Sequence, residues 1–135
     1  MTKKPKITVG KRKEAVARAR ISSGTGILRY NGMLIENVNP EMIRMMIKEP
    51  LIIANDVSKK IDLNIKVSGG GTIGQAEAAR QAIALGIVDF CGKKYKKIFE
   101  DYDRHLLVKD SRRNEPHKPS RSSAGPRRHK QRSKR

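Results

Sequence analysis

The feature that most limits what this chain can fold into is its C-terminal segment, residues 109–135. The segment contains eleven Lys or Arg residues against Asp110 and Glu115, and Ala124 is its one hydrophobic residue. So little apolar side-chain area cannot offset the conformational entropy that the segment would lose on folding. We therefore expect a tail that is disordered or extended until a polyanion orders it, and a globular domain confined to residues 1–108.

The rest of the chain is large enough for one small domain with a modest core. The whole chain has 135 residues, of which 36% are hydrophobic, and the tail takes almost none of these. The composition of residues 1–108 is therefore typical of a single globular domain.

The charge of the chain indicates the class of its partner. Its 31 basic and 13 acidic residues give a net charge of +18, and half of that charge lies in the tail. Such an excess favours a polyanion, most simply a nucleic acid. A membrane surface is the rival partner, but it calls for a basic helix with Trp or Phe on its apolar face, and the chain has no Trp and two Phe. No apolar region follows the charged start and no apolar run is long enough to cross a bilayer, so we expect a cytoplasmic protein without a membrane partner.

Residues that would support catalysis or metal binding are sparse. The single Cys91 has no partner for a disulfide within the chain, and the three His residues lack the spacing of zinc ligands. Asp101, Asp103 and His105 could form an acid–base group or a Mg²⁺ site, but we interpret them as surface residues at a helix end. We predict no enzymatic activity, no cofactor, no metal and no small-molecule substrate.

Two strands are predicted in the first third of the chain. Residues 11–21 alternate, which places small apolar residues on one strand face and mainly basic residues on the other. After turn-forming residues at 23–26, residues 27–30 predict a second strand that ends at Asn31 and Gly32, and we expect the two strands to pair as a hairpin. The apolar face is Ala15, Ala17, Ala19 and Ile21, and the other face is Arg12, Val16, Arg18 and Arg20.

A helix is predicted to begin at Asn39 and Pro40, an N-cap residue followed by proline. We expect Pro50 to break or offset this helix, with a further turn over residues 51–55. Four residues at helical spacing are predicted to pack against the sheet: Met42, Ile43, Met46 and Ile47.

The middle of the chain predicts a strand, a glycine loop and a long helix. Residues 61–68 alternate strictly, residues 69–71 are all glycine, and a helix is expected over residues 74–88. A third helix is predicted over residues 92–102, and residues 105–108 predict a last strand or an extended anchor. The apolar face of the long helix is Ala76, Ala79, Ile83 and Ile87.

The glycine loop satisfies G-x-G-x-x-G through Gly69, Gly71 and Gly74, between a strand and a helix. A dinucleotide site also needs an acid at the end of a second parallel strand, and none is predicted here. A P-loop needs Lys and Ser or Thr after the last glycine, where Gln75 and Ala76 stand. A nucleotide-dependent enzyme is therefore the least favoured hypothesis. A structural turn remains open, and we favour contact between the loop backbone and an RNA phosphate.

Three segments resemble the family of the universal ninth protein of the small ribosomal subunit. They are residues 10–18, residues 62–80 with the glycine loop, and residues 107–112 followed by the basic tail. The segment from Glu115 to Pro126 is similar to the archaeal and eukaryotic branch, and the Lys-Arg ending favours the archaeal one. Arg132 stands where the bacterial family has an aromatic residue, so base stacking at that position is not expected.

The resemblance implies an α+β fold in which a mixed four-stranded sheet packs against helices, as in the second domain of ribosomal protein S-five. It also implies a left-handed β-α-β crossover, which the usual handedness rule would have argued against. The implied function is that of a structural constituent of the small ribosomal subunit. The body would bind ribosomal RNA in the subunit head beside neighbouring head proteins, and the tail would reach the anticodon stem-loop of the peptidyl-site tRNA.

The candidate RNA-binding residues come from the basic strand, the glycine loop and the tail. We expect the arginines to fork onto phosphates and the lysines to act as point charges. A free RNA chaperone or a tRNA-processing subunit is the alternative function. For ribosomal RNA the residues are Lys11, Arg12, Lys13, Arg18, Arg20, Gly69, Gly70, Gly71, Gln75, Arg112, Arg113, Lys118, Arg121, Arg127, Arg128 and Lys130, and for tRNA they are Ser133, Lys134 and Arg135.

Overall fold

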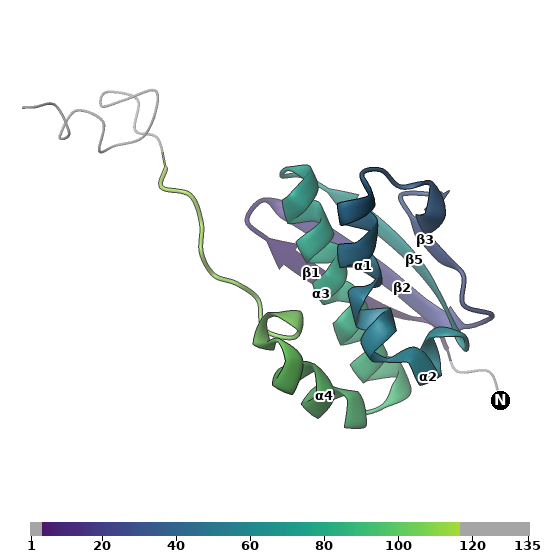
Figure 1. Ribbon diagram of the computed structural model, residues 1–135. Coiled ribbons are helices and arrows are strands. Elements are labelled where there is room, and N and C mark those ends of the chain that lie inside the picture. Colours follow the sequence, from purple (N-terminus) through teal and green to yellow (C-terminus); the bar gives the residue numbers. More distant parts are fainter. Residues whose placement is uncertain (1–3, 117–135) are drawn as a thin grey trace, which may run out of the picture.

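A five-stranded mixed sheet forms one layer of the structure, a computed structural model that describes residues 4–116 (Figure 1). The strand order is β1-β2-β5-β3-β4, and all neighbours are antiparallel except β3 and β5, which are parallel. This confirms the predicted α+β class with a mixed sheet. The strands are β1 (Lys6–Arg12), β2 (Ala15–Ser23), β3 (Leu28–Tyr30), β4 (Met33–Leu34) and β5 (Ile61–Ser68).

The predicted number of four strands was wrong because β3 does not simply end at Asn31 and Gly32. These two residues have φ of +48° and +86°, the left-handed values that a tight two-residue hairpin turn requires. The turn brings Met33 and Leu34 back along β3 as a short fifth strand at the edge of the sheet.

The predicted pairing of β2 with β3 was also wrong, because β5 lies between them in the sheet. The hairpin partner of β2 is β1, and the chain reverses between them at Lys13 and Glu14, where Lys13 has a φ of +52°. The alternating pattern continues across this reversal, so it gave no sign that residues 11–21 belong to two strands.

All helices lie on one side of the sheet (Figure 1). Helix α3 is longer than predicted, and the expected third helix is present as α4. The segment predicted as a last strand or anchor begins with a 3-10 turn and has no strand, although Leu106 in it is fully buried. The helices are α1 (Glu41–Ile53), α2 (Asn55–Ser58), α3 (Thr72–Cys91) and α4 (Lys94–Tyr102), and the 3-10 turns are η1 (Ile35–Asn37) and η2 (Arg104–Leu106).

Helix α1 runs through Pro50, which was expected to break it. Proline removes one backbone donor, but Pro50 itself is buried, and its carbonyl still accepts a hydrogen bond from Ala54 N–H at 3.1 Å. Burial of the proline within the fold therefore outweighs the lost bond. Ile43 and Ile47 are buried as predicted and Met46 is half-buried, whereas Met42 is 60% exposed, so the prediction for Met42 was wrong.

The path from β3 to the parallel β5 passes through β4, α1 and α2. In Figure 1 the helices lie in front of the sheet, both strands run upward and β5 lies to the left of β3. That arrangement is a left-handed crossover, as the family resemblance implied and against the usual rule.

The core lies between the sheet and helices α1 and α3. Ala15, Ala17 and Ala19 on β2 are fully buried, and so are all four residues predicted for the apolar face of α3. Small side chains allow α3 to lie very close to the sheet. The closest approach is at Gly10, where an added Cβ atom would stand 2.0 Å from the carbonyl oxygen of Ala78.

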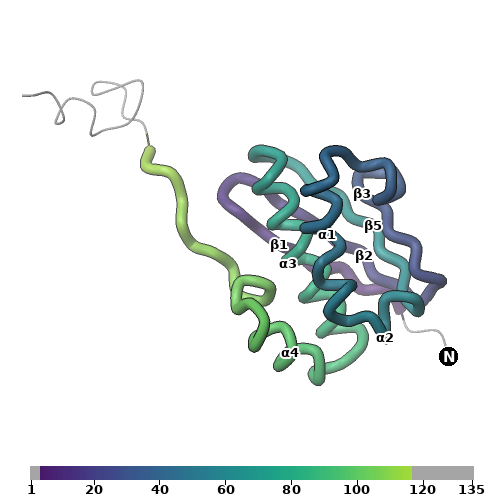
Figure 2. Tube along the Cα trace, viewed as in Figure 1, coloured from purple at the N-terminus to yellow at the C-terminus, as the bar shows by residue number. Residues whose placement is uncertain are grey.

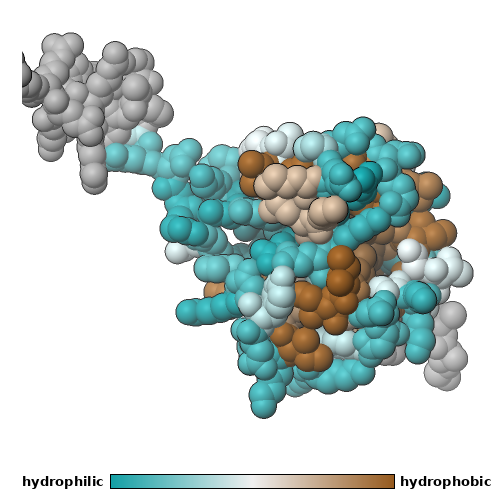
Figure 3. Space-filling model, in the orientation of Figure 1, coloured by the Kyte–Doolittle hydropathy of each residue, from teal (hydrophilic) through white to brown (hydrophobic). Residues whose placement is uncertain are grey.

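The outer surface of the helical layer is mixed. Figure 3 views this side and shows apolar patches among hydrophilic side chains. Met42, Met45 and Ile52 are the exposed large apolar residues of α1. Within residues 4–116 no helix has the length and apolar character needed to cross a membrane.

Candidate nucleic-acid interface

Within residues 4–116, no layer covers the side of the sheet opposite the helices, and we call this side the open face. Because side chains alternate along a strand, the residues between the buried alanines of β2 point to this side. Strand pairing then shows which residues of the other strands share it. The open face consists of Ile7, Val9 and Lys11 of β1, Val16, Arg18, Arg20 and Ser22 of β2, Asp62, Asn64, Lys66 and Ser68 of β5, Arg29 of β3 and Leu34 of β4.

The open face is strongly basic. Arg18, Arg20, Arg29 and Lys66 are all exposed and make no ion pair with any residue in the described range. Arg18 stands directly opposite Lys66 in the β2–β5 register. Like charges in such a cross-strand pair repel each other and cost stability. An arrangement of this kind suits a surface that receives an anion.

Apolar side chains lie beside these cations. Ile7 is 68% exposed, while Val9 and Val16 are half-buried on the same face. The face thus offers aliphatic contact together with charge. Its described residues include no aromatic side chain, so stacking on bases is not part of its chemistry.

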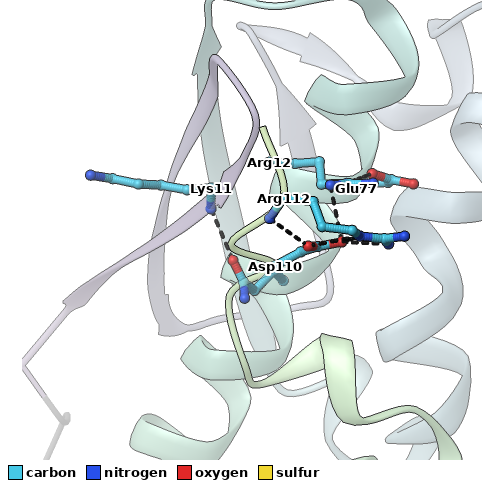
Figure 4. Close-up of polar contacts among 6 residues, drawn as sticks. Lys11, Arg12, Glu77, Asp110 and Arg112 are labelled. Carbon is cyan, nitrogen blue, oxygen red and sulfur yellow. Dashed lines mark hydrogen bonds and ion pairs between the residues drawn. The ribbon is translucent and has the colours of Figure 1, made fainter. Parts of the chain in front are cut away.

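Of the predicted ribosomal-RNA residues, Lys11, Arg18 and Arg20 share the open face, but Arg12 does not. The sequence pattern placed Arg12 with Arg18 and Arg20, and this was wrong because the turn at Lys13 intervenes. Arg12 pairs in register with Ala15, whose side chain faces the helices. Figure 4 shows Arg12 directed toward Glu77 and Asp110, while the Lys11 side chain points away from that cluster.

Arg12 forms ion pairs with acids from two elements. Its Nε donates to Oε2 of Glu77 on α3, and its Nη1 lies 3.0 Å from Oδ2 of Asp110. Arg112 donates to both oxygens of the same aspartate, with Nη2 2.7 Å from Oδ2. The hydrogen bonds from Arg112 and the charge of Arg12 hold the pKa of the Asp110 carboxyl far below its usual range.

The predicted residues Lys13 and Arg113 lie near this cluster. Lys13 is exposed in the β1–β2 turn, and Arg113 Nη1 lies 2.8 Å from Oε1 of Glu14 in the same turn. The described start of the tail therefore contacts the body at the turn. Figure 2 shows that the chain continues from here away from the helices.

The glycine loop packs against the same turn. Gly69 and Gly70 have φ of +75° and +64°, and a Cβ atom on Gly69 would stand 2.5 Å from the Glu14 carbonyl oxygen. Gly71 faces open space, and Gln75 Nε2 donates to the Gly69 carbonyl. Backbone conformation and close packing thus explain why glycine occupies positions 69 and 70. Contact of these two glycines with RNA stays a prediction. A groove of about 480 Å³ runs between the loop and the turn.

Two cations of the open face, Arg29 and Lys66, were missed by the sequence reasoning. Lys66 occupies a polar position of the clearest alternating strand, so the sequence pattern predicts that it lies on the polar face of that strand. Its place beside Arg18 depends on strand pairing, which the pattern does not give. Lys11 is fixed in another way that the sequence did not show, because its backbone N–H donates to Gln81 Oε1 on α3 at 2.9 Å.

Asp62, the only acid on the open face, is engaged by the backbone. Its Oδ1 accepts hydrogen bonds from the N–H groups of Thr25, Gly26 and Ile27 at 2.8, 3.0 and 2.9 Å. These bonds, that from Ile27 foremost, lower the pKa of the Asp62 carboxyl. Asp62 therefore closes the β2–β3 loop, and it makes no ion pair with the cations of the face among the described residues.

Asp103 and His105, which were considered for an acid–base group or a Mg²⁺ site, make structural contacts at the end of α4. Asp103 Oδ1 accepts the backbone N–H of His105, and Oδ2 pairs with Arg80 at 2.9 Å. Among residues 4–116, no group of three or more His, Cys, Asp or Glu residues is placed to hold a metal ion. The remaining predicted residues lie outside the described range, namely Lys118, Arg121, Arg127, Arg128, Lys130, Ser133, Lys134 and Arg135.

Comparison with known proteins gives a consistent family. The sequence profile of the family described as Ribosomal protein S9/S16 matches residues 10–135. Small ribosomal subunit protein uS9 of Methanococcus vannielii is 48% identical over 127 residues, which cover 93% of this chain and 95% of the relative. The same protein of Methanococcus maripaludis shows the same identity and coverage. The predicted resemblance, including its archaeal character, is confirmed, and the chain belongs to the S9/S16 family of ribosomal proteins.

Proposed function

We propose that this protein binds ribosomal RNA through the open face of its sheet and reaches the peptidyl-site tRNA with its tail. As a member of its family it is a structural constituent of the small ribosomal subunit and not an enzyme. It associates with the RNA and the proteins of that subunit, and it acts in translation in the cytoplasm.

The observation that carries the RNA interface is the cluster of cations on the open face. Arg18, Arg20, Arg29 and Lys66 project from three neighbouring strands, none of them is paired with an acid of residues 4–116, and Arg18 faces Lys66 directly. Phosphate contacts position a protein on RNA and remove such repulsion. Lys13, Gly71 and Arg112 lie at the β1–β2 turn end of the molecule and would extend the contact along the RNA backbone.

The tail supplies the second part of the proposal. Its net charge is half of that of the chain, and its poverty in apolar residues suits a path between closely packed phosphates. With about eight phosphates contacted by the whole chain, log affinity should fall with log salt at a slope of about −6. Residues 133–135 would contact tRNA at the end of that path, in the subunit head.

The RNA interface is tested with two charge-matched triple variants of the full chain. One replaces Arg18, Arg20 and Lys66 by Gln, and the other replaces the exposed Lys93, which precedes α4, and the exposed α4 residues Lys96 and Lys97 by Gln. Affinity for small-subunit ribosomal RNA is measured across a salt series. The open-face variant should bind at least about tenfold more weakly and lose about 2 units of slope, because each lost phosphate contact removes about 0.7. If both variants lose the same affinity and the same slope, RNA binding depends only on the total charge of the chain and not on the open face.

The tRNA contact is tested by deleting residues 133–135. Small subunits containing the shortened chain should assemble normally yet bind peptidyl-site tRNA more weakly, because the deletion removes Lys134 and Arg135 but no part of the body. Unchanged tRNA retention would contradict this part of the proposal. Sedimentation of the chain away from ribosomes would instead favour a free RNA chaperone or a tRNA-processing subunit.

A further inference from the structure

Asp110, at the start of the tail, makes a contact that RNA binding does not explain. The tail is otherwise almost wholly basic, and an acid within it weakens the attraction of a polyanion. An aspartate on an irregular segment is ordinarily solvated. The Asp110 side chain is only 11% exposed, however, and it turns back into the body (Figure 4).

The carboxylate of Asp110 is contacted by two guanidinium groups. Arg12, itself only 18% exposed, lies between this carboxylate and Glu77 of α3, so it links the tail to the helical layer. Arg112 holds both carboxylate oxygens from the other side, through Nε at 3.1 and 3.0 Å and through Nη2 at 2.7 Å. The hydrogen bonds from Arg112 give the carboxylate a defined orientation, and Arg12 Nη1 adds an ion pair without a hydrogen bond.

A second contact lies three residues further on. Arg113 pairs with Glu14 of the β1–β2 turn at 2.8 Å, and Asn114 lines the groove beside the glycine loop. A chain held at one point can pivot, whereas a chain held at two successive points has a direction. The contacts of Asp110 and Arg113 thus set both the place and the direction in which the chain leaves the body.

We propose that Asp110, with Arg12 as its partner, is a positioning residue that fixes the direction of the tail relative to the RNA-binding face. The inference rests on the proposed function, in which the end of the tail reaches the peptidyl-site tRNA. Fixing the start of a flexible segment raises the effective concentration of its far end at that target. Arg12, which the sequence placed among the RNA-binding residues, serves this contact.

The direct test is a measurement of backbone dynamics on the free, full-length chain. Asp110→Asn removes the charge with little change in shape, and Asp101→Asn on the exposed surface of α4 is the charge-matched control. In the unmodified chain and in the control, amide order parameters of residues 111–114 should be close to about 0.85, the value of rigid backbone. In Asp110→Asn they should fall below about 0.6, while those of β1, β2 and α3 stay unchanged.

Three results would overturn the inference. Residues 111–114 could remain rigid in Asp110→Asn, or they could already be flexible in the unmodified chain. A loss of order throughout β1 and α3 would likewise contradict it, because Asp110 would then stabilise the fold and not the tail direction.

A functional measurement separates this inference from the tRNA proposal. Small subunits carrying Asp110→Asn should bind peptidyl-site tRNA several-fold more weakly, and subunits lacking residues 133–135 serve as the reference. If that deletion weakens tRNA binding and Asp110→Asn does not, the positioning role fails and the tRNA contact stands. If the deletion has no effect, the tRNA contact fails, and the order parameters still decide whether Asp110 fixes the tail.

Discussion

The two faces of the sheet carry opposite kinds of residue although they belong to the same strands. On the covered face, Ala17 and Ala19 of β2 have no exposed surface. On the open face, Arg18 and Arg20 alternate with them and have no acid partner in the described part of the chain. Because the side-chain period of a strand is two, one strand supplies core residues at every second position and exposed positive charge at the positions between them.

The largest effect is expected from Gly10→Ala on the covered face. The added methyl group would meet the Ala78 carbonyl oxygen at 2.0 Å and the Ala82 nitrogen at 2.7 Å, and both belong to the backbone of α3. The helix must move away from β1, so we expect the free energy of unfolding in urea to fall by about 3 kcal/mol or more.

The matched control for this prediction is Gly71→Ala. Gly71 has a φ of −97°, and no heavy atom lies within 4 Å of an added Cβ there. The free energy of unfolding of the Gly71→Ala variant should differ from that of the unmodified chain by less than about 0.5 kcal/mol. Equal stability of the two variants would show that α3 does not press on β1 as described.

The next largest effect is expected from Asp62→Ala, which tests whether an open-face residue can be structural. The substitution leaves three backbone N–H groups of the β2–β3 loop without their acceptor. We expect a loss of about 2 kcal/mol in urea unfolding. Asn64→Ala, two residues along the same strand, is the control and should change stability little. If both variants behave alike, the loop does not depend on Asp62.

The pH dependence of stability provides a separate check on this contact. Because hydrogen bonds lower the pKa of Asp62 in the folded state, its contribution is present above the unfolded pKa of about 3.9 and is lost as the pH falls further. The stability difference between the unmodified chain and Asp62→Asn should therefore be full at neutral pH and narrow below about pH 4. A constant difference down to pH 2 would contradict this.

The smallest effect is expected from Arg18→Gln on the open face. The change removes the like-charge pair with Lys66, and Arg18 makes no side-chain hydrogen bond or ion pair with any residue of the range 4–116. The protein should therefore be as stable as before or more stable by about 0.5 kcal/mol at low salt, as measured by its melting temperature. Lys97→Gln on α4 removes the same charge and should show no such gain. A loss above about 1 kcal/mol would show that Arg18 also supports the fold.

Much of the fold could be predicted because its signals are local. The alternation of residues 61–68, the apolar face of α3 and the small residues of β2 each follow from a period along the chain. The number of strands and the partner of β2 could not be predicted in this way, because each depends on where the chain reverses. At Lys13 and at Asn31 the reversal takes two residues and leaves the surrounding pattern unbroken.

The candidate site was predictable in part for the same reason. Arg18 and Arg20 were identified correctly as residues of one basic face, since they lie two residues apart on one strand. Lys66 was missed, although it stands opposite Arg18, because cross-strand neighbours are 48 residues apart in the chain. Arg12 was placed on the wrong face because the turn at Lys13 separates it from β2. The alternation of side chains along β2 therefore does not extend to Arg12.

The sequence by itself determined the class of partner and the family, because charge and motif are properties of residue order. Only the tertiary structure decided which arginines of the described range are paired with acids of the same chain and which are left without an acid partner there. The physical reason is that an ion pair depends on distance in space. Arg12 meets Asp110 across 98 positions, whereas Arg18 meets another cation, and no pattern along the chain distinguishes the two.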